Sequence, residues 1–204
     1  AFEYFMPELF LPTFENSFID ESLSFAFYNQ RLFRRNRVWG VSESGFYSFD
    51  SDMNYQYKAH GVPSLALKKY RGDEFVVSPY SSFIMLCKNP EAVIRNLRNL
   101  KELGMYGEYG FYEAIDLSSE PGGIVRSYMS HHTGMIMIAC ANACFGNIFQ
   151  RRFMADKAIA ACKELLCEKI PTDVHLYPTA FNPPRKEKTR YPAAEPADEV
   201  HTLA

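Results

Sequence analysis

Apolar side chains recur at helical spacing in several stretches of the chain. Residues 16–35 form the first stretch, and arginines gather in its last turn, where cations stabilise a helix. Asn89 and Pro90 suit the cap and first position of a second helix, an apolar stripe of period 3.6 follows, and Gly104 suits its end. The remaining helices are predicted over 79–87, 130–140 and 156–167.

Glycine and aromatic residues dominate the segments between these helices. Residues 39–57 mix them irregularly with Ser and Asp, which indicates a loop or a short hairpin. Residues 105–123 have a similar composition, and no regular series of strands is apparent. We therefore predict an all-α fold of helix hairpins whose long loops, 39–60 and 105–124, meet at one end. A functional site would lie at that end.

The composition is that of a globular protein of one large domain or two small ones. The chain has 204 residues, 47% hydrophobic and 23% charged, which excludes disorder over most of its length. The formal net charge is −2, so nucleic acid is not an expected partner. The chain has 17 Phe and 13 Tyr. Tyrosines near a pocket would suit a ligand with apolar faces and hydroxyl edges, such as a sugar; the alternative is that they pack in a helical core.

The cysteines do not predict a disulfide scaffold or a metal site. The five cysteines, at positions 87, 140, 144, 162 and 167, are odd in number and irregularly spaced. This favours reduced structural thiols and a reducing compartment. Cys140 and Cys144 lack further ligands at metal spacing, and the adjacent His131 and His132 point in different directions. We expect no metal and no cofactor, and no apolar run approaches the roughly 18 residues of a membrane span.

Glu3, Glu43 and Glu113 are the main candidates for catalysis. Each is flanked by aromatic residues or glycine rather than lying on a solvated helix face. A carboxylate beside aromatic rings loses solvation, and two facing carboxylates are the minimum apparatus for cleaving a glycosidic bond. The alternative is that each glutamate pairs with an arginine or caps a turn.

Other polar and aromatic residues suit a binding role. His131 and His132 could hydrogen-bond to sugar hydroxyls or hold a loop, and Arg126 could clamp a carboxylate. Tyr55 and Tyr57 would share one face of an extended segment, either as a stacking platform or as edge-strand residues. The sequence has no Walker A, GxGxxG or GxSxG pattern.

Several motifs, taken in order, resemble one known family. They are Phe-Glu-Tyr-Phe-Met-Pro (2–7), Trp-Gly-Val-Ser-Glu-Ser (39–44), Tyr-Gln-Tyr-Lys-Ala-His-Gly-Val-Pro (55–63), Val-Val-Ser-Pro-Tyr (76–80), Tyr-Gly-Phe-Tyr-Glu-Ala-Ile-Asp (109–116) and Met-Ser-His-His-Thr-Gly-Met (129–135). Over residues 2–150 the chain is similar to the glucoamylase-like domain of bacterial cyclic β-1,2-glucan synthases. It departs from the family pattern at Ser64, where many relatives have Gly, and at Thr133, where Gln is usual.

The resemblance implies a fold, an activity and a location. The fold would be the C-terminal half of an (α/α)6 toroid, with a partial domain over 1–175 and a Pro-rich linker or tail over 176–204. The activity would be retaining transglycosylation that cyclises linear β-1,2-glucan. The domain would be a soluble part of a larger, membrane-anchored parent, on its cytoplasmic side, and helix faces carrying Phe25, Leu97 and Ile136 would promote self-association.

The resemblance also implies a set of site residues. Glu43, Glu113 and Glu3 would be catalytic, with Glu43 suited to stay ionised, Glu3 suited to act as the acid and Glu113 either catalytic or orienting. The cleft would be lined by Trp39, Tyr55, Tyr57, Tyr112, Arg126, His131 and His132. The alternatives are an inverting β-1,2-glucanase and a non-catalytic glycan-binding or interaction module.

Overall fold

Helices and short strands alternate along the chain in this computed structural model, which describes residues 1–66, 74–118 and 122–169. These residues belong to one compact unit, Ala1–Ile170. The helices are α1 (Phe2–Phe5), α2 (Phe18–Leu32), α3 (Pro79–Phe83), α4 (Pro90–Glu102), α5 (Ser130–Cys144), α6 (Ile148–Met154), α7 (Lys157–Ala161) and α8 (Lys163–Leu166), with 3-10 turns η1 (Pro7–Leu9) and η2 (Pro63–Leu65). The strands are β1 (Ser44–Phe49), β2 (Tyr55–Lys58), β3 (Val76–Val77), β4 (Tyr106–Gly107), β5 (Gly110–Phe111), β6 (Ala114–Asp116) and β7 (Gly123–Val125).

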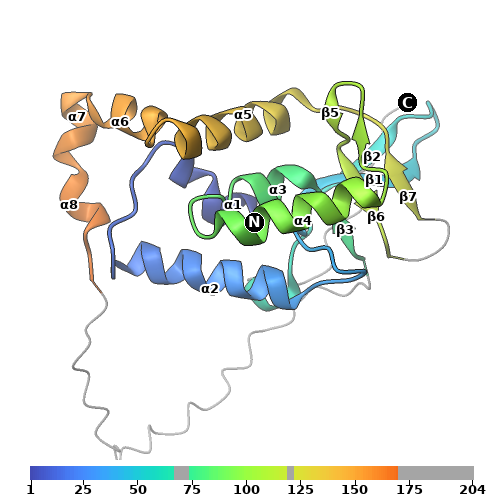
Figure 1. Ribbon diagram of the computed structural model, residues 1–204, viewed down its shortest axis with the longest axis horizontal. Helices are drawn as coiled ribbons and strands as arrows, with labels where there is room; N and C mark the ends of the chain where they lie inside the picture. Colours follow the sequence, from blue (N-terminus) through green and yellow to red (C-terminus); the bar gives the residue numbers. More distant parts are fainter. Residues whose placement is uncertain (67–73, 119–121, 170–204) are drawn as a thin grey trace, which may run out of the picture. The chain divides into compact units, whose positions relative to one another are not determined.

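The strands form small antiparallel sheets at one end of this unit, and α7 and α8 lie at the other (Figure 1). β1 pairs with β2, β4 pairs with β5, and β6 lies between β3 and β7. β1 also packs against β6 and β7, so the segments 39–60 and 105–124 lie together. They do so as paired strands rather than as loops, and the all-α fold class predicted from the sequence is therefore wrong.

The strands are short and depend on partners that are distant in the chain. β3 has two residues, and Val76 pairs with Asp116 of β6. Alternation of apolar and polar residues becomes a recognisable strand signal only over about 4–8 residues. Tertiary pairing therefore forms these strands, and local pattern does not reveal them.

The long helices follow their sequence signals. Ser17 caps α2 by accepting a hydrogen bond from the Asp20 backbone, and Asn89 caps α4 in the same way through Ala92. α2, α4 and α5 confirm the predicted helices over 16–35, 89–104 and 130–140. The predicted helix at 156–167 is present as two pieces, α7 and α8, and α6 was not predicted.

The two larger of three apolar clusters form most of the core of the described residues. One joins α1, α2, α3, α4 and α5 through side chains that include Phe5, Leu23 and Val93. The other lies beneath the strands and includes Val41 and Ile115. Leu97 and Ile136, which the sequence suggested as exposed, are partly buried against the first cluster. Phe25 is exposed as predicted.

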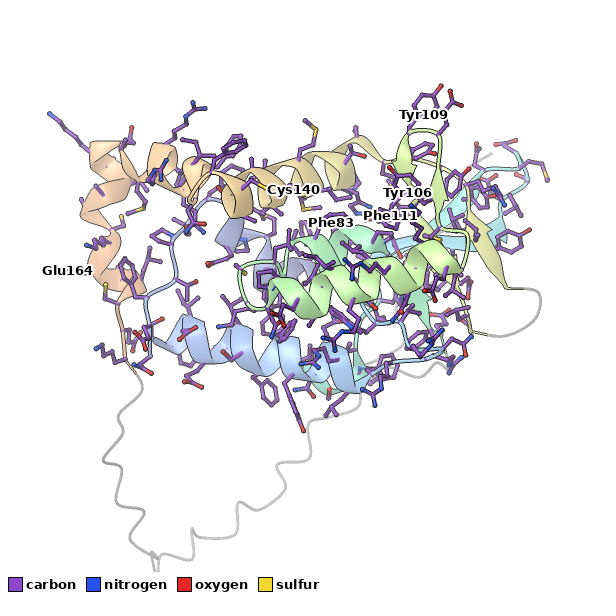
Figure 2. All side chains as sticks on the ribbon, in the orientation of Figure 1. Phe83, Tyr106, Tyr109, Phe111, Cys140 and Glu164 are labelled. Atoms are coloured by element: carbon purple, nitrogen blue, oxygen red, sulfur yellow. The ribbon has the colours of Figure 1, made fainter. Side chains whose placement is uncertain are left out.

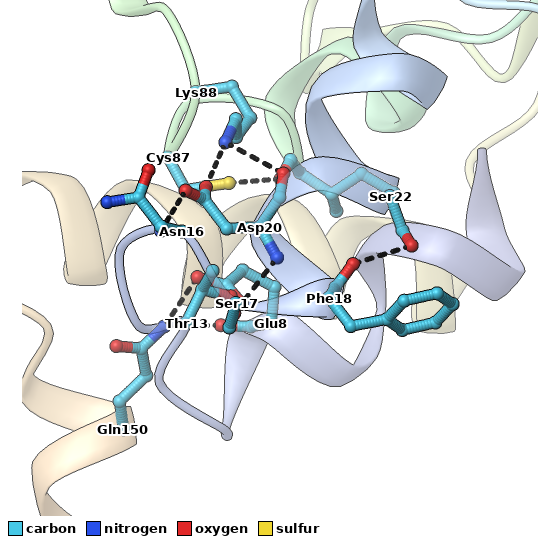
Figure 3. Close-up of polar contacts among 11 residues, drawn as sticks. Glu8, Thr13, Asn16, Ser17, Phe18, Asp20, Ser22, Cys87, Lys88 and Gln150 are labelled. Carbon is cyan, nitrogen blue, oxygen red and sulfur yellow. Dashed lines mark hydrogen bonds and ion pairs between the residues drawn. The ribbon is translucent and has the colours of Figure 1, made fainter. Parts of the chain in front are cut away.

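A polar network connects the N-terminal segment with α2, with α6 and with the turn before α4 (Figure 3). Lys88, in the turn before α4, forms an ion pair of 2.6 Å with Asp20 of α2, and this hydrogen bond holds the pKa of Asp20 below its usual value. Glu8 of η1 accepts a hydrogen bond from Thr13, while Gln150 of α6 donates to the Glu8 backbone carbonyl. Burial raises the pKa of Glu8, and hydrogen bonds from Thr13 and Gln150 partly oppose that rise.

Within the described residues, no single helix has both the length and the hydropathy needed to cross a bilayer. α5 and α6 meet that criterion only when taken together, and they are bent by 94° relative to each other. The predicted tail at 176–204 lies outside the described residues.

Candidate functional site

Glu43 follows a backbone segment that two buried amide side chains hold in place. Gln30 of α2 accepts from the Val41 backbone N–H at 3.0 Å and donates to the Val41 carbonyl at 2.8 Å. Asn96 of α4 makes the same pair of bonds to Trp39, at 3.1 and 2.8 Å. Since each amide satisfies both backbone groups of one residue, residues 39–41 are fixed immediately before the carboxylate.

Glycine is required at position 40 within this segment. Its φ is +110°, a conformation that residues with a side chain rarely adopt. A Cβ there would lie 2.6 Å from Ser81 Oγ and 2.8 Å from Ser82 Oγ. The chain thus passes close to the start of α3, and Ser81 donates to the Gly40 carbonyl at 2.7 Å.

Glu3 and Glu43 line the same cavity, which has a volume of about 400 Å³. Its walls come from residues 1–4, from Ser42 and Glu43, and from parts of 59–66. Ser42 Oγ accepts from the Phe2 backbone N–H at 3.1 Å, which joins the two carboxylate-bearing segments. Glu3 is exposed and Glu43 is half-buried, so both carboxylates are accessible from this hollow.

Tyr57 of β2 holds the Glu43 carboxylate. Its hydroxyl donates to Glu43 Oε1 at 2.8 Å. Burial, followed by the hydrogen bond to Glu43, raises the pKa of Tyr57 far above its ordinary value. The phenol therefore keeps its proton at neutral pH and remains a donor to Glu43.

Glu113 is buried beside a different, small pocket and is paired with His132. His132 Nδ1 donates to Glu113 Oε2 at 2.9 Å, and the Gly45 backbone N–H donates to Oε1 at 3.2 Å. The His132 ring stacks on Tyr80 with centroids 3.7 Å apart and planes 15° apart. Tyr80 in turn donates to the Glu43 carbonyl, so Glu113 is connected to the backbone of Glu43 through two rings.

His131 and Tyr57 lie beside this pair. The His131 ring is 4.0 Å from that of His132 and 6.3 Å from that of Tyr57. Loss of solvation, and then the neighbouring His132, hold the pKa of His131 below its ordinary value. Tyr57 and both histidines therefore meet between Glu43 and Glu113.

The remaining predicted site residues lie elsewhere around the strand end. Arg126 Nη1 is 3.4 Å from the Tyr112 hydroxyl, and Tyr112 borders a small pocket that Glu113 also lines. Tyr55 packs against Tyr47 and Phe49 on the β1–β2 hairpin.

The structure places Trp39 in the core rather than in the cavity. Only 6% of it is exposed, and its ring meets Phe27 edge-on at 5.7 Å. It borders a different hollow of about 370 Å³, which also holds Arg31, Arg34 and Arg95. A tryptophan beside a glycine turn suggested sugar stacking, but the same ring fits the apolar cluster between α2 and α4.

His60 lines the cavity and was not singled out from the sequence. Its Nε2 donates to the Val76 carbonyl at 3.1 Å, while its buried Nδ1 has no hydrogen-bond partner. Burial lowers the pKa of His60, which favours the neutral ring with Nδ1 as an acceptor. Its place in the motif at 55–63 was the available signal.

The arrangement suits acid–base or nucleophilic chemistry by carboxylates. Two accessible glutamates share a hollow, a protonated tyrosine orients one of them, and a third glutamate is held inside by a histidine and a backbone N–H. Among the described residues, no three His, Cys, Asp or Glu side chains are placed to hold a metal ion.

The fold resembles part of larger solved structures. A β-1,2-glucanase from Parabacteroides distasonis superposes with a TM-score of 0.58 at 18% identity, over 81% of this chain and 24% of the other. A protein from Bacteroides caccae, described as a "putative glucoamylase", superposes with a TM-score of 0.52 at 19% identity, over 73% and 34% of the two chains. At these identities the likeness concerns the fold alone.

The chain belongs to the Glycoamylase family, described as "Putative glucoamylase", whose sequence model matches residues 23–157. It is also 35% identical over 181 residues to the cyclic beta-(1,2)-glucan synthase NdvB of Rhizobium meliloti. That alignment covers 85% of this chain and 6% of the synthase. The chain therefore spans only a small part of the length of this relative.

Proposed function

We propose that this domain acts on β-1,2-linked glucan by retaining transglycosylation, with Glu43 as the nucleophile and Glu3 as the acid/base. The observation that carries the proposal is that Glu3 and Glu43 line one cavity while Tyr57 orients Glu43. The substrate class comes from the synthase relative, whose name specifies β-1,2-glucan.

In the proposed reaction, Glu43 attacks the anomeric carbon as Glu3 gives its proton to the departing glycosidic oxygen. A covalent glycosyl ester forms, and a sugar hydroxyl then attacks it while Glu3 takes up the proton of that hydroxyl. If the acceptor belongs to the same glucan chain, the product is a ring. The mechanism requires the two carboxylates to lie about 5 Å apart during the reaction.

Glu113 is a positioning residue in this scheme. Both of its oxygens already accept hydrogen bonds, from Gly45 and His132, and its side chain is buried. Through His132 and Tyr80 it supports the segment that carries Glu43. His60 forms part of the cavity wall, where its Nε2 is held by the Val76 carbonyl.

We further propose that the domain works within a larger, membrane-anchored polypeptide, on the cytoplasmic side. The support is the resemblance of the motifs to the cyclic β-1,2-glucan synthase family and the small share of the NdvB length that the chain spans.

The proposal is tested by product analysis with the full-length protein that carries this chain. Linear β-1,2-glucan should be converted to cyclic or transferred products that keep the β configuration, whereas linear β-1,3-glucan should not react. Products of inverted configuration would instead support the glucanase alternative. No reaction with β-1,2-glucan would contradict the proposed function and favour a non-catalytic module.

An activated β-glucosyl donor tests the roles of the carboxylates. A good leaving group needs no proton, so it should partly rescue Glu3→Gln but should not rescue Glu43→Gln. If the activated donor rescued Glu43→Gln and not Glu3→Gln, Glu43 would be the acid/base and Glu3 the nucleophile.

A further inference from the structure

Three tyrosines form a row from the tip of the β4–β5 hairpin to the pocket beside Glu113. The ring of Tyr109 meets that of Tyr128 edge-on, with centroids 5.7 Å apart. Tyr128 is followed by Tyr112 at 5.4 Å with the planes tilted by 37°. Tyr112 and Tyr128 both line the pocket that contains Glu113 and His132.

The outer end of this row is open to solvent. Tyr109 is 76% exposed and points away from the body of the protein at the hairpin tip (Figure 2). Tyr128 is 39% exposed. Neighbouring exposed rings that form a contiguous patch are typical of an interaction site.

The hairpin is shaped to accommodate the rings. Gly107 pairs with Gly110 across a two-residue turn, and Gly110 has a φ of +103°. A Cβ at position 107 would lie 2.4 Å from the Tyr112 hydroxyl and 2.8 Å from that of Tyr128. Glycine at position 107 therefore allows both rings to pack against the hairpin backbone.

We infer that Tyr109, Tyr128 and Tyr112 form an outer binding platform for a β-glucan chain, on the side of the site where Glu113 and His132 lie. This inference rests on the proposed function and adds a second substrate-binding region outside the Glu3–Glu43 cavity. Sugar rings present apolar faces for stacking and hydroxyl edges for hydrogen bonds, and tyrosine offers both kinds of contact. The rings lie at 83° and 37° to one another, so the row offers a glucan ring edges and hydroxyls as well as ring faces.

The inner end of the row has a polar group that suits the same ligand. The Arg126 guanidinium lies 5.2 Å from the centroid of the Tyr112 ring, and its Nη1 is 3.4 Å from the Tyr112 hydroxyl. The guanidinium has five N–H donors, which leaves some for sugar hydroxyls. A stable protein interface buries about 800 Å² on each partner, which is more than three side chains supply.

The test compares long and short substrates in the full-length protein. Tyr109→Ala should raise KM for long linear β-1,2-glucan by roughly five- to tenfold. The reason is that the loss of one aromatic contact weakens binding by about that factor. It should leave kcat and the KM for a β-1,2-linked trisaccharide unchanged. Tyr109→Phe keeps the ring and should behave as the wild type.

Tyr106→Ala is the matched control. Tyr106 lies in the same hairpin and is 53% exposed, but its ring contacts are Phe111 and Lys101 rather than the row. Its removal should leave the KM for long glucan unchanged.

The outcomes separate this inference from the proposed function. If the wild type turns over β-1,2-glucan but Tyr109→Ala and Tyr128→Ala leave the KM for long chains unchanged, the platform is excluded while the function stands. An equal loss with Tyr106→Ala would also overturn the inference. If Tyr109→Ala changes the oligomeric state and not glucan binding, the row is a protein interface instead.

Discussion

The three candidate glutamates differ in how the surrounding residues hold them. Glu3 is exposed, Glu43 is half-buried with one hydrogen bond from Tyr57, and Glu113 is buried with both oxygens occupied. A nucleophile must be oriented and still accessible, and Glu43 meets both conditions. The inner position of Glu113 fits a supporting role.

Tyr57→Phe tests how much the orientation of Glu43 matters. The substitution removes the hydroxyl that donates to Glu43 and leaves the ring in place. A hydrogen bond to a charged group contributes about 1.5–3 kcal/mol, and the partial exposure of Tyr57 favours the lower end. We expect kcat to fall by roughly tenfold with little change in the melting temperature. Unchanged kcat would mean that Tyr57 does not orient the reacting carboxylate.

Glu8 gives a prediction about stability and pH. Burial raises its pKa in the folded protein, so the folded state binds the Glu8 proton more tightly than the unfolded state does. The stabilising effect of this proton is present below the unfolded pKa and is lost as pH rises through the folded pKa. Glu8→Gln should therefore raise the unfolding free energy at pH 7 relative to wild type.

The comparison of Glu8→Gln with wild type should be made by denaturant unfolding across the acid range. The difference should disappear near pH 4, where the wild-type side chain is also neutral. A difference that stays constant with pH would show that the substitution acts through packing and not through the proton.

At the scale of the elements, α2 and α4 hold the segment 39–41, which precedes Glu43, through side-chain hydrogen bonds to its backbone. Gln30 and Asn96 are buried, and each satisfies both backbone groups of one residue in this segment. Removal of such an amide leaves a buried donor and a buried acceptor unpaired. Each unpaired group costs about 1–3 kcal/mol.

Gln30→Met keeps the volume of the side chain and removes the clamp on Val41. We expect a loss of about 2–4 kcal/mol in unfolding free energy, since two backbone groups lose their partners. Gln56→Met at an exposed position of β2 is the control and should cost less than about 0.5 kcal/mol. A similar small loss for both variants would mean that residues 39–41 find other partners.

The sequence was sufficient to predict the helices that carry their own local signals. Asn89, Pro90 and the apolar stripe of α4 act within a few residues of one another, so a local pattern predicts the helix. β3 and β6 form only because Val76 meets Asp116 from a distant segment. Distant pairing of two- and three-residue strands leaves no periodic pattern, and the fold class was wrong for that reason.

The sequence suggested residue types for the candidate site but not their arrangement. The motifs contained Glu43, Tyr57 and His132, which the structure brings close to one another. They could not show that Trp39 fits the core or that His60 lines the cavity. Burial and hydrogen-bond partners depend on the packing of segments from the whole unit, and a motif does not encode them.

At the scale of the whole molecule, α2 has an apolar face that the described residues do not cover. Phe18, Phe25, Tyr28 and Leu32 follow helical spacing, and each is more than half exposed. An apolar stripe of this kind normally marks an interface or promotes aggregation. We expect the 204-residue chain to self-associate in light scattering.

A double substitution, Phe25→Glu with Leu32→Glu, should shift this equilibrium toward monomer because it places charges on the stripe. Both positions face solvent in the single chain, so the fold should tolerate the change. A wild-type chain that is already monodisperse and monomeric, with a high melting temperature, would contradict the prediction.

The central claim is that glycosidic chemistry takes place at the Glu3–Glu43 cavity, and the turnover of linear β-1,2-glucan by Glu43→Gln in the full-length protein tests it most directly. Gln keeps the volume and removes the charge, so the loss should be about a thousandfold or more with the fold unchanged. Glu164→Gln, on exposed α8 at the other end of the unit, is the control and should keep wild-type turnover (Figure 2). Near-native turnover by Glu43→Gln would contradict the account and would mean that Glu43 is structural.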